Sequence, residues 1–323
     1  MLTLPTVATF ERDERPAYRP YEVTVRAIRR VNAHLVRITF GGEQLRFFGT
    51  DGLDQRVKIV LPLPGFGISD FGAADEQTIA EGTWYSRWRE LPNSLRNPFR
   101  TYTVRAVRPG LGELDVEFVV HAEPVGQGSL GPAARWLTTV RVGDELVVVG
   151  PDCRSIHSAV GIDWHPGEAT ELLLVGDETA APAICSILES LPFGVRATAF
   201  IEVESNRDAV GVDSRADVAL TWVARDSGPS TLETVVREWT ARNLDRIESE
   251  LAPGPQPLDD IDVDIDLLWD SPEAKPGAHF YAWLAGESAL IKSLRRFLVS
   301  ETGIDRSRVS FMGYWRCGKA EAQ

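Results

Sequence analysis

The sequence predicts a two-domain protein, in which a six-stranded antiparallel β-barrel is followed by a doubly wound parallel-sheet α/β domain. Three observations predict this fold. At 323 residues the chain is longer than one hydrophobic core usually grows. Its first half contains short runs of alternating β-branched residues with turn signals between them. Beyond Gly150 and Pro151, continuous apolar runs alternate with segments of helical periodicity.

Six runs in the first half are predicted to form the barrel strands: 21–31, 36–40, 56–61, 100–108, 113–121 and 145–149. Turn signals such as Pro109-Gly110 separate them, which favours an antiparallel barrel over 18–152, preceded by an extended arm over 1–17. The gap at 62–97 contains Trp84 and Trp88. It is either a lid over the barrel mouth or a plain surface loop.

The second half, 170–323, shows the alternation of strands and helices that is typical of a parallel sheet covered on both faces. The predicted strands are 172–175, 197–203, 219–224, 279–285 and 309–312. The predicted helices are 180–191, 231–239 and 288–300. The domain boundary is expected between 151 and 171.

A net charge of −13 disfavours nucleic acid and anionic membranes as partners. Much of the acidity lies in 258–270, which contains six aspartates and no basic residue. Because Pro and Gly bracket this stretch, we expect the acidic loop 253–276 to be an exposed or partly disordered insertion without a chemical role.

The three cysteines, Cys153, Cys185 and Cys317, are far apart in the sequence. This spacing disfavours a disulfide framework or a zinc or iron–sulfur site and predicts buried free thiols. No apolar run is long enough to cross a bilayer, and the N-terminus lacks the pattern of a signal peptide. We therefore expect a cytoplasmic protein without membrane insertion.

Two segments carry residue types suited to a flavin dinucleotide. In residues 100–105, RTYTVR, alternation places Arg100 and Tyr102 on one face of a strand, and Thr103 would reach a cofactor only if the strand lies edge-on. Residues 121–136 form a glycine-rich turn that runs into a short helix. A planar guanidinium and a helix N-terminus are suited to a pyrophosphate. The alternative for the first segment is an ordinary amphipathic strand.

With these residues in view, the chain resembles the siderophore-interacting proteins, a bacterial flavoprotein family within the ferredoxin-reductase-like group. The resemblance extends from about residue 18 to 318. It rests on RTYTVR, on DVEFVVH followed by GSLGPAARW, on VGDETAAPAI, on WLAGESALIKSLRRFL and on GYWRCG. It implies an FAD-binding barrel, a nucleotide-binding α/β domain, and an oxidoreductase that reduces a ferric siderophore with electrons from NAD(P)H or reduced ferredoxin.

The resemblance also implies which residues bind the cofactor. They are Arg100, Thr101, Tyr102, Thr103, His121, Gly128, Ser129, Gly131, Ala133, Trp136, Asp177, Thr179, Ala180, Tyr314 and Trp315. Alternatives stay open for three of them: His121 as a surface histidine, Trp136 as a core residue, and Asp177 as a helix N-cap.

An otherwise acidic protein needs local positive charge to admit an anionic ferric chelate. Lys58, Arg316 and Lys319, the latter two in the tail 313–323, are the candidates for this cluster, and solvated surface charge is the alternative for each. No metal ligands are expected from the protein, because the chelator already surrounds the iron.

The electron donor is the least defined part of this interpretation. Asp177 and Glu178 stand where a Gly-rich nucleotide turn would lie, and two carboxylates there would repel a nucleotide phosphate. NADH, NADPH and ferredoxin all remain open. The competing functions are a general NAD(P)H:flavin or ferredoxin-type reductase and a non-catalytic siderophore-binding flavoprotein.

Overall fold

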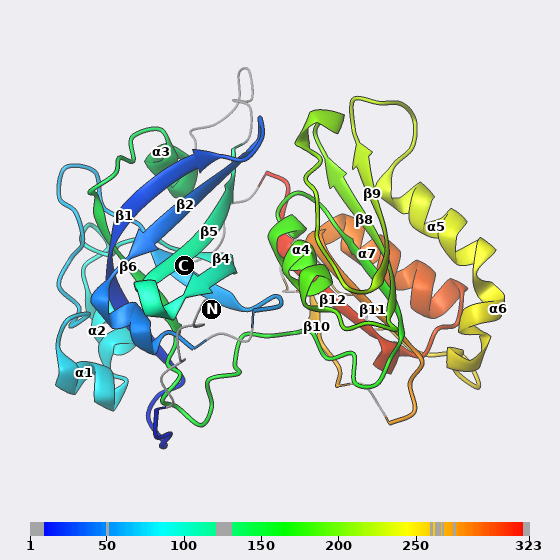
Figure 1. Cartoon of the computed structure of the whole chain (residues 1–323), viewed down its shortest axis with the longest axis horizontal. Coiled ribbons are helices and arrows are strands. Elements are labelled where there is room, and N and C mark those ends of the chain that lie inside the picture. The colour runs from blue at the N-terminus through cyan, green and yellow to red at the C-terminus, as the bar shows by residue number, and fades with distance from the viewer. Residues whose placement is uncertain are drawn as a thin grey trace, which may run out of the picture. The chain divides into compact units, whose positions relative to one another are not determined.

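A computed structural model describes residues 10–49, 52–120, 131–258, 261, 266, 268–273 and 276–318. These residues form two compact units, which divide after Ile162 (Figure 1). The first unit is a closed β-barrel, and the second is a sheet with helices on both faces. Both predicted architectures are therefore confirmed.

Six antiparallel strands close the barrel of the first unit. They are β1 Tyr18–Arg30, β2 Leu35–Gly41, β3 Arg56–Val60, β4 Phe99–Arg108, β5 Glu113–Val119 and β6 Glu145–Pro151. Hydrogen bonds join them in the order β1-β2-β5-β4-β3-β6. Each predicted run forms one of these strands. Because side chains alternate between the two faces, Ile38 and Phe40 of β2 meet Val116 and Phe118 of β5 in the barrel core.

The segment between β3 and β4 packs on the outer face of the barrel. It contains α1 Glu76–Glu81 and α2 Trp84–Glu90. Trp84 and Trp88 of α2 are buried against Val147 and Val149 of β6. These valines face outward, because their neighbours Leu146 and Val148 belong to the barrel core. The segment is thus a packed layer with its own apolar cluster, unlike the plain surface loop that we considered.

The sheet of the second unit has six strands in the order β10-β12-β11-β7-β8-β9. They are β7 Glu171–Gly176, β8 Arg196–Val203, β9 Asp217–Ala224, β10 Trp269–Asp270, β11 Phe280–Glu287 and β12 Val309–Trp315. Neighbouring strands are parallel except for the short edge strand β10, which is antiparallel to β12. The chain leaves β7 toward β9 and then returns to the other side of β7, so the strand order reverses between β7 and β11.

Helices cover both faces of this sheet, as Figure 1 shows for α4 and α5. They are α4 Ala181–Ser190, α5 Leu232–Arg242, α6 Leu244–Ile247 and α7 Ser288–Arg295, and α7 continues into a π-helical turn, Arg296–Glu301. Leu173 of β7 packs with Val236 of α5 and Leu294 of α7 in one core cluster. Alternation along β7 leaves Leu172 and Leu174 for the α4 face.

The remaining helical elements are short. They are α3 Pro132–Leu137 and the 3-10 turns η1 Glu43–Phe47, η2 Pro109–Leu111, η3 Asn206–Asp208, η4 Glu248–Glu250 and η6 Arg306–Arg308. No helix among the described residues is long and apolar enough to cross a membrane.

The described parts of the acidic loop are more ordered than the sequence suggested. Leu258 and Ile261 pack against the core cluster of the sheet, and Lys292 of α7 donates to the carbonyl of Ile261 over 2.6 Å. Trp269 and Asp270 form strand β10. The expectation of an exposed insertion is therefore wrong for these residues, because their apolar side chains have a core to bury in. Residues 259–260, 262–265, 267 and 274–275 lie outside the described part.

The cysteines also differ from the prediction of buried thiols. All three are free, but only Cys185 is buried, whereas Cys153 is intermediate and Cys317 is exposed. Cys185 lies on α4, whose other side chains are largely buried too. The sequence alone could not separate these three positions, because small residues are accepted at the surface as well as in a core.

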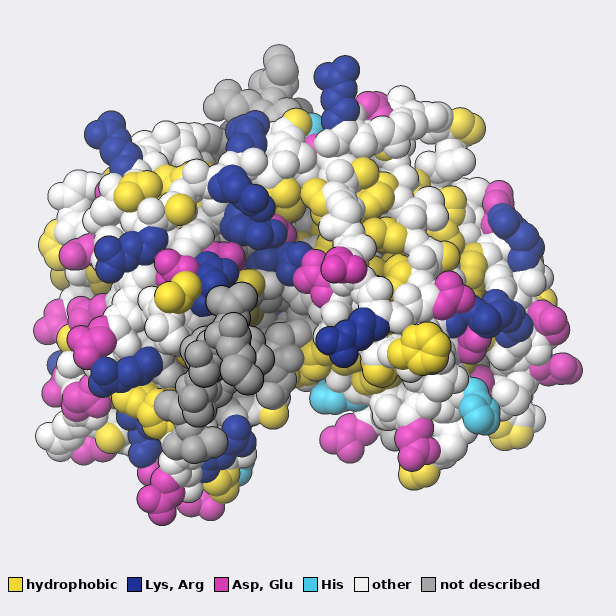
Figure 2. All heavy atoms as spheres, in the orientation of Figure 1, with side chains coloured by type: hydrophobic (Ala, Val, Ile, Leu, Met, Phe, Trp, Pro, Cys, Tyr) yellow, Lys and Arg dark blue, Asp and Glu magenta, His cyan; other side chains and the backbone are white. Residues whose placement is uncertain are grey.

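Surface arginines in the second unit are largely paired with carboxylates. Figure 2 shows basic side chains next to acidic ones on the visible face of this unit. Arg237, for example, contacts Glu233 over 3.0 Å and Glu301 over 2.9 Å. Exposed pairs of this kind contribute little to stability. These ion pairs show, however, that most described arginines on the surface of the second unit have a carboxylate that compensates their charge.

Candidate functional site

Strand β4 presents the first group of predicted site residues on two faces. Arg100 and Tyr102 lie opposite Ile59 and Val57 of β3, whose side chains belong to the barrel core. The Tyr102 ring packs on Phe118, with 4.4 Å between the ring centroids. The predicted alternation is confirmed: Arg100 and Tyr102 share the inner face of the strand.

Thr101 and Thr103 belong to the opposite, outer face of β4. There the hydroxyl of Thr101 accepts a hydrogen bond from the Nζ of Lys58, which is exposed on the neighbouring strand β3, over 2.6 Å. Thr103 lies opposite Arg56 in the register with β3. Lys58 and Thr101 are therefore next to each other, although they are far apart in the sequence.

The two halves of β4 have different neighbours. The register with β3 covers Phe99 to Thr103, whereas the described register with β5 begins at Val104 and shifts before Ala106. The segment with the predicted flavin contacts is thus joined to the barrel through β3. The contact between Thr103 and the cofactor stays a prediction.

Helix α3 provides the next group. Among the described residues, Gly131 is its N-cap without a side-chain capping bond, and a Cβ at this glycine would meet no described heavy atom within 4 Å. Ala133 is partly buried in the first turn. Trp136 is 8% exposed and packs on Phe118 with 5.5 Å between ring centroids, which agrees with the core alternative. His121, Gly128 and Ser129 lie outside the described residues.

Asp177 occupies the carboxyl end of β7, beside the point where the strand order reverses. Its Oδ1 accepts hydrogen bonds from the backbone N–H and the hydroxyl of Thr179 over 2.9 and 2.5 Å. Its Oδ2 accepts from the backbone N–H of Glu287 over 2.8 Å and from the indole Nε1 of Trp315 over 2.7 Å. One buried carboxylate therefore connects the ends of β7, β11 and β12.

Burial is the largest cause that raises the pKa of Asp177, and the adjacent Glu178 raises it further. The hydrogen bonds from Thr179 and Trp315 act in the opposite direction without cancelling this rise. Helix α4 as assigned begins at Ala181, after Ala180. Asp177 caps the turn that leads into it, because its backbone carbonyl accepts the N–H of Ala181 over 3.1 Å and its Oδ1 accepts the N–H of Thr179. The capping role considered for Asp177 is therefore present, together with its bonds to Glu287 and Trp315.

Two glycines make room for this arrangement. Gly286 has φ +153°, and a Cβ there would lie 2.7 Å from Oδ2 of Asp177. At Gly176, a Cβ would lie 2.5 Å from the Cβ of Ala180 and 2.7 Å from the carbonyl oxygen of Ala285. Gly286 and Glu287 were not predicted from the sequence. The available signal was the Gly-Glu pair that directly follows the apolar run of a predicted strand, as Gly176 and Asp177 follow the run of β7.

The C-terminal strand carries the last group. Tyr314 stacks on Trp269 of β10 with 5.8 Å between ring centroids. Arg316 donates a hydrogen bond to the backbone carbonyl of Asp266, and the backbone N–H of Cys317 donates to Glu287 over 3.3 Å. Tyr314, Trp315 and Arg316 thus follow one another at the carboxyl edge of the sheet. Lys319 lies outside the described residues.

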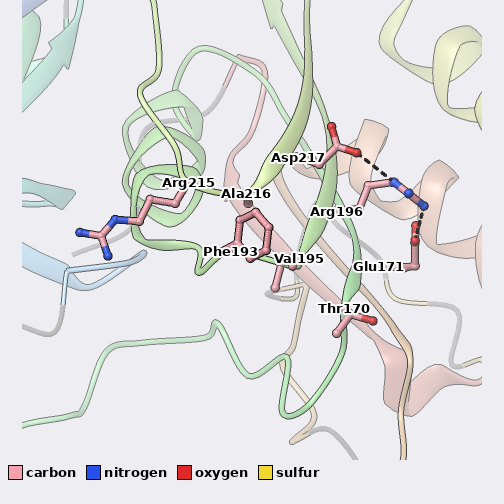
Figure 3. Close-up of a pocket in the computed structure, with 9 residues that line it drawn as sticks. Thr170, Glu171, Phe193, Val195, Arg196, Arg215, Ala216 and Asp217 are labelled. Carbon is pink, nitrogen blue, oxygen red and sulfur yellow. Dashed lines mark hydrogen bonds and ion pairs between the residues drawn. The ribbon is translucent and has the colours of Figure 1, made fainter.

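A hollow of about 430 Å³ lies at the opposite, amino edge of the sheet (Figure 3). Arg196 bridges Glu171 over 2.7 Å and Asp217 over 3.2 Å there, Phe193 is 91% exposed, and Arg215 points away from the hollow. This hollow contains none of the predicted site residues. Ligands of open α/β sheets bind at the carboxyl ends of the strands.

Comparisons with known proteins agree with this architecture. Residues 24–155 match the family model of the siderophore-interacting FAD-binding domain, and residues 169–318 match that of the siderophore-interacting protein. Ferric vibriobactin reductase ViuB of Vibrio cholerae is 26% identical over 293 residues, which cover 90% of this chain and 87% of the relative. NADPH-dependent ferric-chelate reductase of Escherichia coli is 26% identical over 296 residues, which cover 91% and 92%. The crystal structure of the siderophore-interacting protein SipS from Aeromonas hydrophila has a TM-score of 0.60 at 28% identity and covers 94% of each chain.

The barrel and the sheet together have the fold of the ferredoxin-reductase-like class, and the barrel matches an FAD-binding domain. Within this class, the chain belongs to the siderophore-interacting protein family. The predicted family, the FAD cofactor and the oxidoreductase class are confirmed. The roles of individual site residues stay predictions.

Proposed function

We propose that this protein is a cytoplasmic FAD-dependent reductase that reduces a ferric siderophore and releases ferrous iron, with electrons from NAD(P)H or reduced ferredoxin. The observation that carries the proposal is the placement of Arg100 and Tyr102 on one face of β4, in a chain whose barrel matches an FAD-binding domain. The ferric vibriobactin reductase of Vibrio cholerae and the ferric-chelate reductase of Escherichia coli, both similar to this chain, support a ferric chelate as the acceptor.

The residues of the barrel fit FAD. Arg100 supplies a guanidinium, and the first turn of α3 begins at Gly131 without a side-chain cap, so backbone N–H groups remain for a pyrophosphate. Tyr102 supplies an aromatic ring that is already held in place by Phe118. We assign the pyrophosphate to Arg100 and α3, and the isoalloxazine ring to Tyr102, with Thr103 donating a hydrogen bond to the edge of that ring.

FAD, when bound, supplies a carrier that takes up two electrons and releases them singly, which suits a one-electron ferric acceptor. The residues of the chain bind and orient the reactants. We assign the anionic chelate to Lys58 and Arg316, with Lys319 as a further candidate. The ferric ion is a substrate that arrives inside its chelator, and the softer ferrous ion is held less firmly by hard oxygen donors.

Steady-state turnover tests this function. The purified holoprotein is mixed anaerobically with a ferric catecholate, a ferrous-specific chromophoric trap, and NADH, NADPH or reduced ferredoxin in turn. We expect ferrous iron to accumulate catalytically with at least one donor, while the oxidised protein without a donor forms none. A protein that binds the chelate but forms no trapped ferrous iron with any donor would be the siderophore-binding alternative.

Replacing Arg100 by alanine is expected to weaken FAD binding by about 10- to 100-fold, because a charge-assisted hydrogen bond contributes roughly 1.5–3 kcal/mol. Flavin absorbance retained after gel filtration, together with titration of the apoprotein with FAD, measures the effect. Arg26→Ala is the matched control, because Arg26 lies on β1, away from β4. An Arg100→Ala protein that stays fully yellow and binds FAD with unchanged affinity would contradict the pyrophosphate assignment.

A further inference from the structure

A second cluster of charged side chains lies at the carboxyl edge of the sheet, over β7, β8 and β9. Its centre is Arg225, which directly follows β9 and whose backbone N–H donates to the carbonyl of Val203 at the end of β8. Glu178 follows β7, while Glu202 and Glu204 lie at the end of β8. Because parallel strands end at the same edge, these four residues meet although they are far apart in the sequence.

The guanidinium of Arg225 is shared by all three carboxylates. It forms two hydrogen bonds with Glu178, over 2.7 and 3.1 Å. It also contacts Glu202 over 3.0 Å and Glu204 over 3.5 Å. One positive charge thus faces three negative ones, and the cluster carries a net negative charge. Glu204 is the most accessible of the carboxylates, with 59% of its side chain exposed.

The loops beside this cluster carry one further arginine, the exposed Arg207 of η3, and two further carboxylates, Asp208 and Asp226, so the edge stays net negative. Asn206 donates to the hydroxyl of Ser227 over 2.6 Å, and Ser205 caps the turn η3. Leu232, the first residue of α5, donates its backbone N–H to Glu202 over 3.4 Å. Among the described contacts of this edge, Arg225 is the cation that the carboxylates share. A second negatively charged group would therefore meet a net negative edge, on which the charge of Arg225 is already compensated by carboxylates.

In doubly wound sheets the adenosine ribose of a dinucleotide lies over the end of the second strand. An acidic residue there accepts hydrogen bonds from the free ribose hydroxyls, whereas an available arginine accommodates a 2′-phosphate. In this chain the second strand is β8, and its end carries Glu202 and Glu204. The 2′-phosphate that distinguishes NADPH from NADH adds about two negative charges at this place.

We infer that Glu202 and Glu204, with Arg225 held between them and Glu178, determine donor specificity and select NADH against NADPH. This inference rests on the proposed function, because it concerns the electron donor of the same reductase. The Escherichia coli relative, by contrast, is an NADPH-dependent ferric-chelate reductase by name. Arg225 lies where a 2′-phosphate would bind, but its positive charge is already compensated by ion pairs with Glu178, Glu202 and Glu204.

Binding measured without turnover tests the inference. The oxidised holoprotein is titrated calorimetrically with NAD⁺ and with NADP⁺ at low ionic strength. We expect NAD⁺ to bind at least about tenfold more tightly than NADP⁺. The repulsion between like charges a few ångströms apart near a protein surface exceeds the free energy that corresponds to a tenfold difference in affinity. The difference is expected to shrink as salt is added. Anaerobic stopped-flow reduction of the flavin by NADH and NADPH should show the same order.

The variant Glu204→Arg is expected to shift the ratio of the two affinities toward NADP⁺ by about tenfold or more, because it replaces a negative charge by a positive one. Glu168→Arg is the matched control, since Glu168 is exposed and precedes β7 at the amino edge. The control should leave the ratio unchanged. Equal or tighter binding of NADP⁺ by the unmodified protein, or an unchanged ratio in Glu204→Arg, would overturn the inference.

Failure of the inference and failure of the proposed function can be told apart. If neither nucleotide binds or reduces the flavin, no dinucleotide uses this edge and the inference is overturned. Protein reduced by dithionite and freed of excess reductant is then mixed with the ferric catecholate and the ferrous trap. Formation of ferrous iron in that experiment would retain the ferric-chelate reductase with another donor.

Discussion

Replacing Asp177 by alanine is expected to lower the free energy of unfolding of the second unit by about 4 kcal/mol. The substitution leaves three partly buried donors without their acceptor: the N–H groups of Thr179 and Glu287 and the indole of Trp315. Each such loss costs roughly 1–3 kcal/mol. Urea unfolding followed by tryptophan fluorescence measures the change. The indole N–H resonance of Trp315 should also shift in the nitrogen–proton correlation spectrum.

Asp177→Asn is expected to be nearly as damaging as Asp177→Ala. The two oxygens of Asp177 face three N–H donors and the hydroxyl of Thr179. An amide group would therefore place a donor against at least one N–H in either orientation. Asp213→Ala, at an exposed position of the same unit, is the control and should change stability by less than about 0.5 kcal/mol. If Asp177→Asn unfolded like the unmodified protein, the carboxylate would not be needed.

Replacing Trp88 by alanine is expected to cost about 3–5 kcal/mol and to release the layer between β3 and β4 from the barrel. Trp88 is 4% exposed and stacks on Phe99 with 4.3 Å between ring centroids. Its Nε1 donates to the carbonyl of Asn97 over 3.0 Å. The loss of both contacts leaves a cavity and an unpaired carbonyl. Limited proteolysis between residues 62 and 97 and thermal unfolding measure the two consequences.

Two further variants make this experiment specific. Trp88→Phe retains an aromatic ring against Phe99 and loses the hydrogen bond, so it should cost only about 1 kcal/mol. Phe66→Ala removes a ring that is 60% exposed in the same segment and should have little effect. A Trp88→Ala protein with unchanged melting temperature and protease resistance would mean that the segment does not depend on this packing for its stability.

Strands and helices could be predicted because their signals are local. The alternation of Val57 and Ile59 with Lys58, or of Arg100 and Tyr102 with their neighbours, follows from the period of a strand. For the apolar run at 172–175, composition alone predicted a strand that is covered on both faces. In the acidic loop, by contrast, composition was misleading, because Leu258 and Ile261 had apolar partners elsewhere in the chain.

The candidate site was only partly accessible from the sequence. Arg100, Tyr102 and the C-terminal Tyr314 and Trp315 were predicted through their motifs, whereas Gly286 was missed. Its importance depends on how close it lies to Asp177, 109 positions earlier in the chain and one strand away in the sheet. Distances of this kind depend on the strand order, which local patterns do not specify.

The sequence by itself determined the two architectures, the family and the cofactor, because periodicity and short motifs are properties of neighbouring residues. Only the tertiary structure decided which charges meet. Asp177 with Trp315, and Arg225 with Glu178 and Glu202, come together because parallel strands from distant parts of the chain end at one edge. An electrostatic interaction depends on distance in space, so the role of each carboxylate emerges only when the strands are placed side by side.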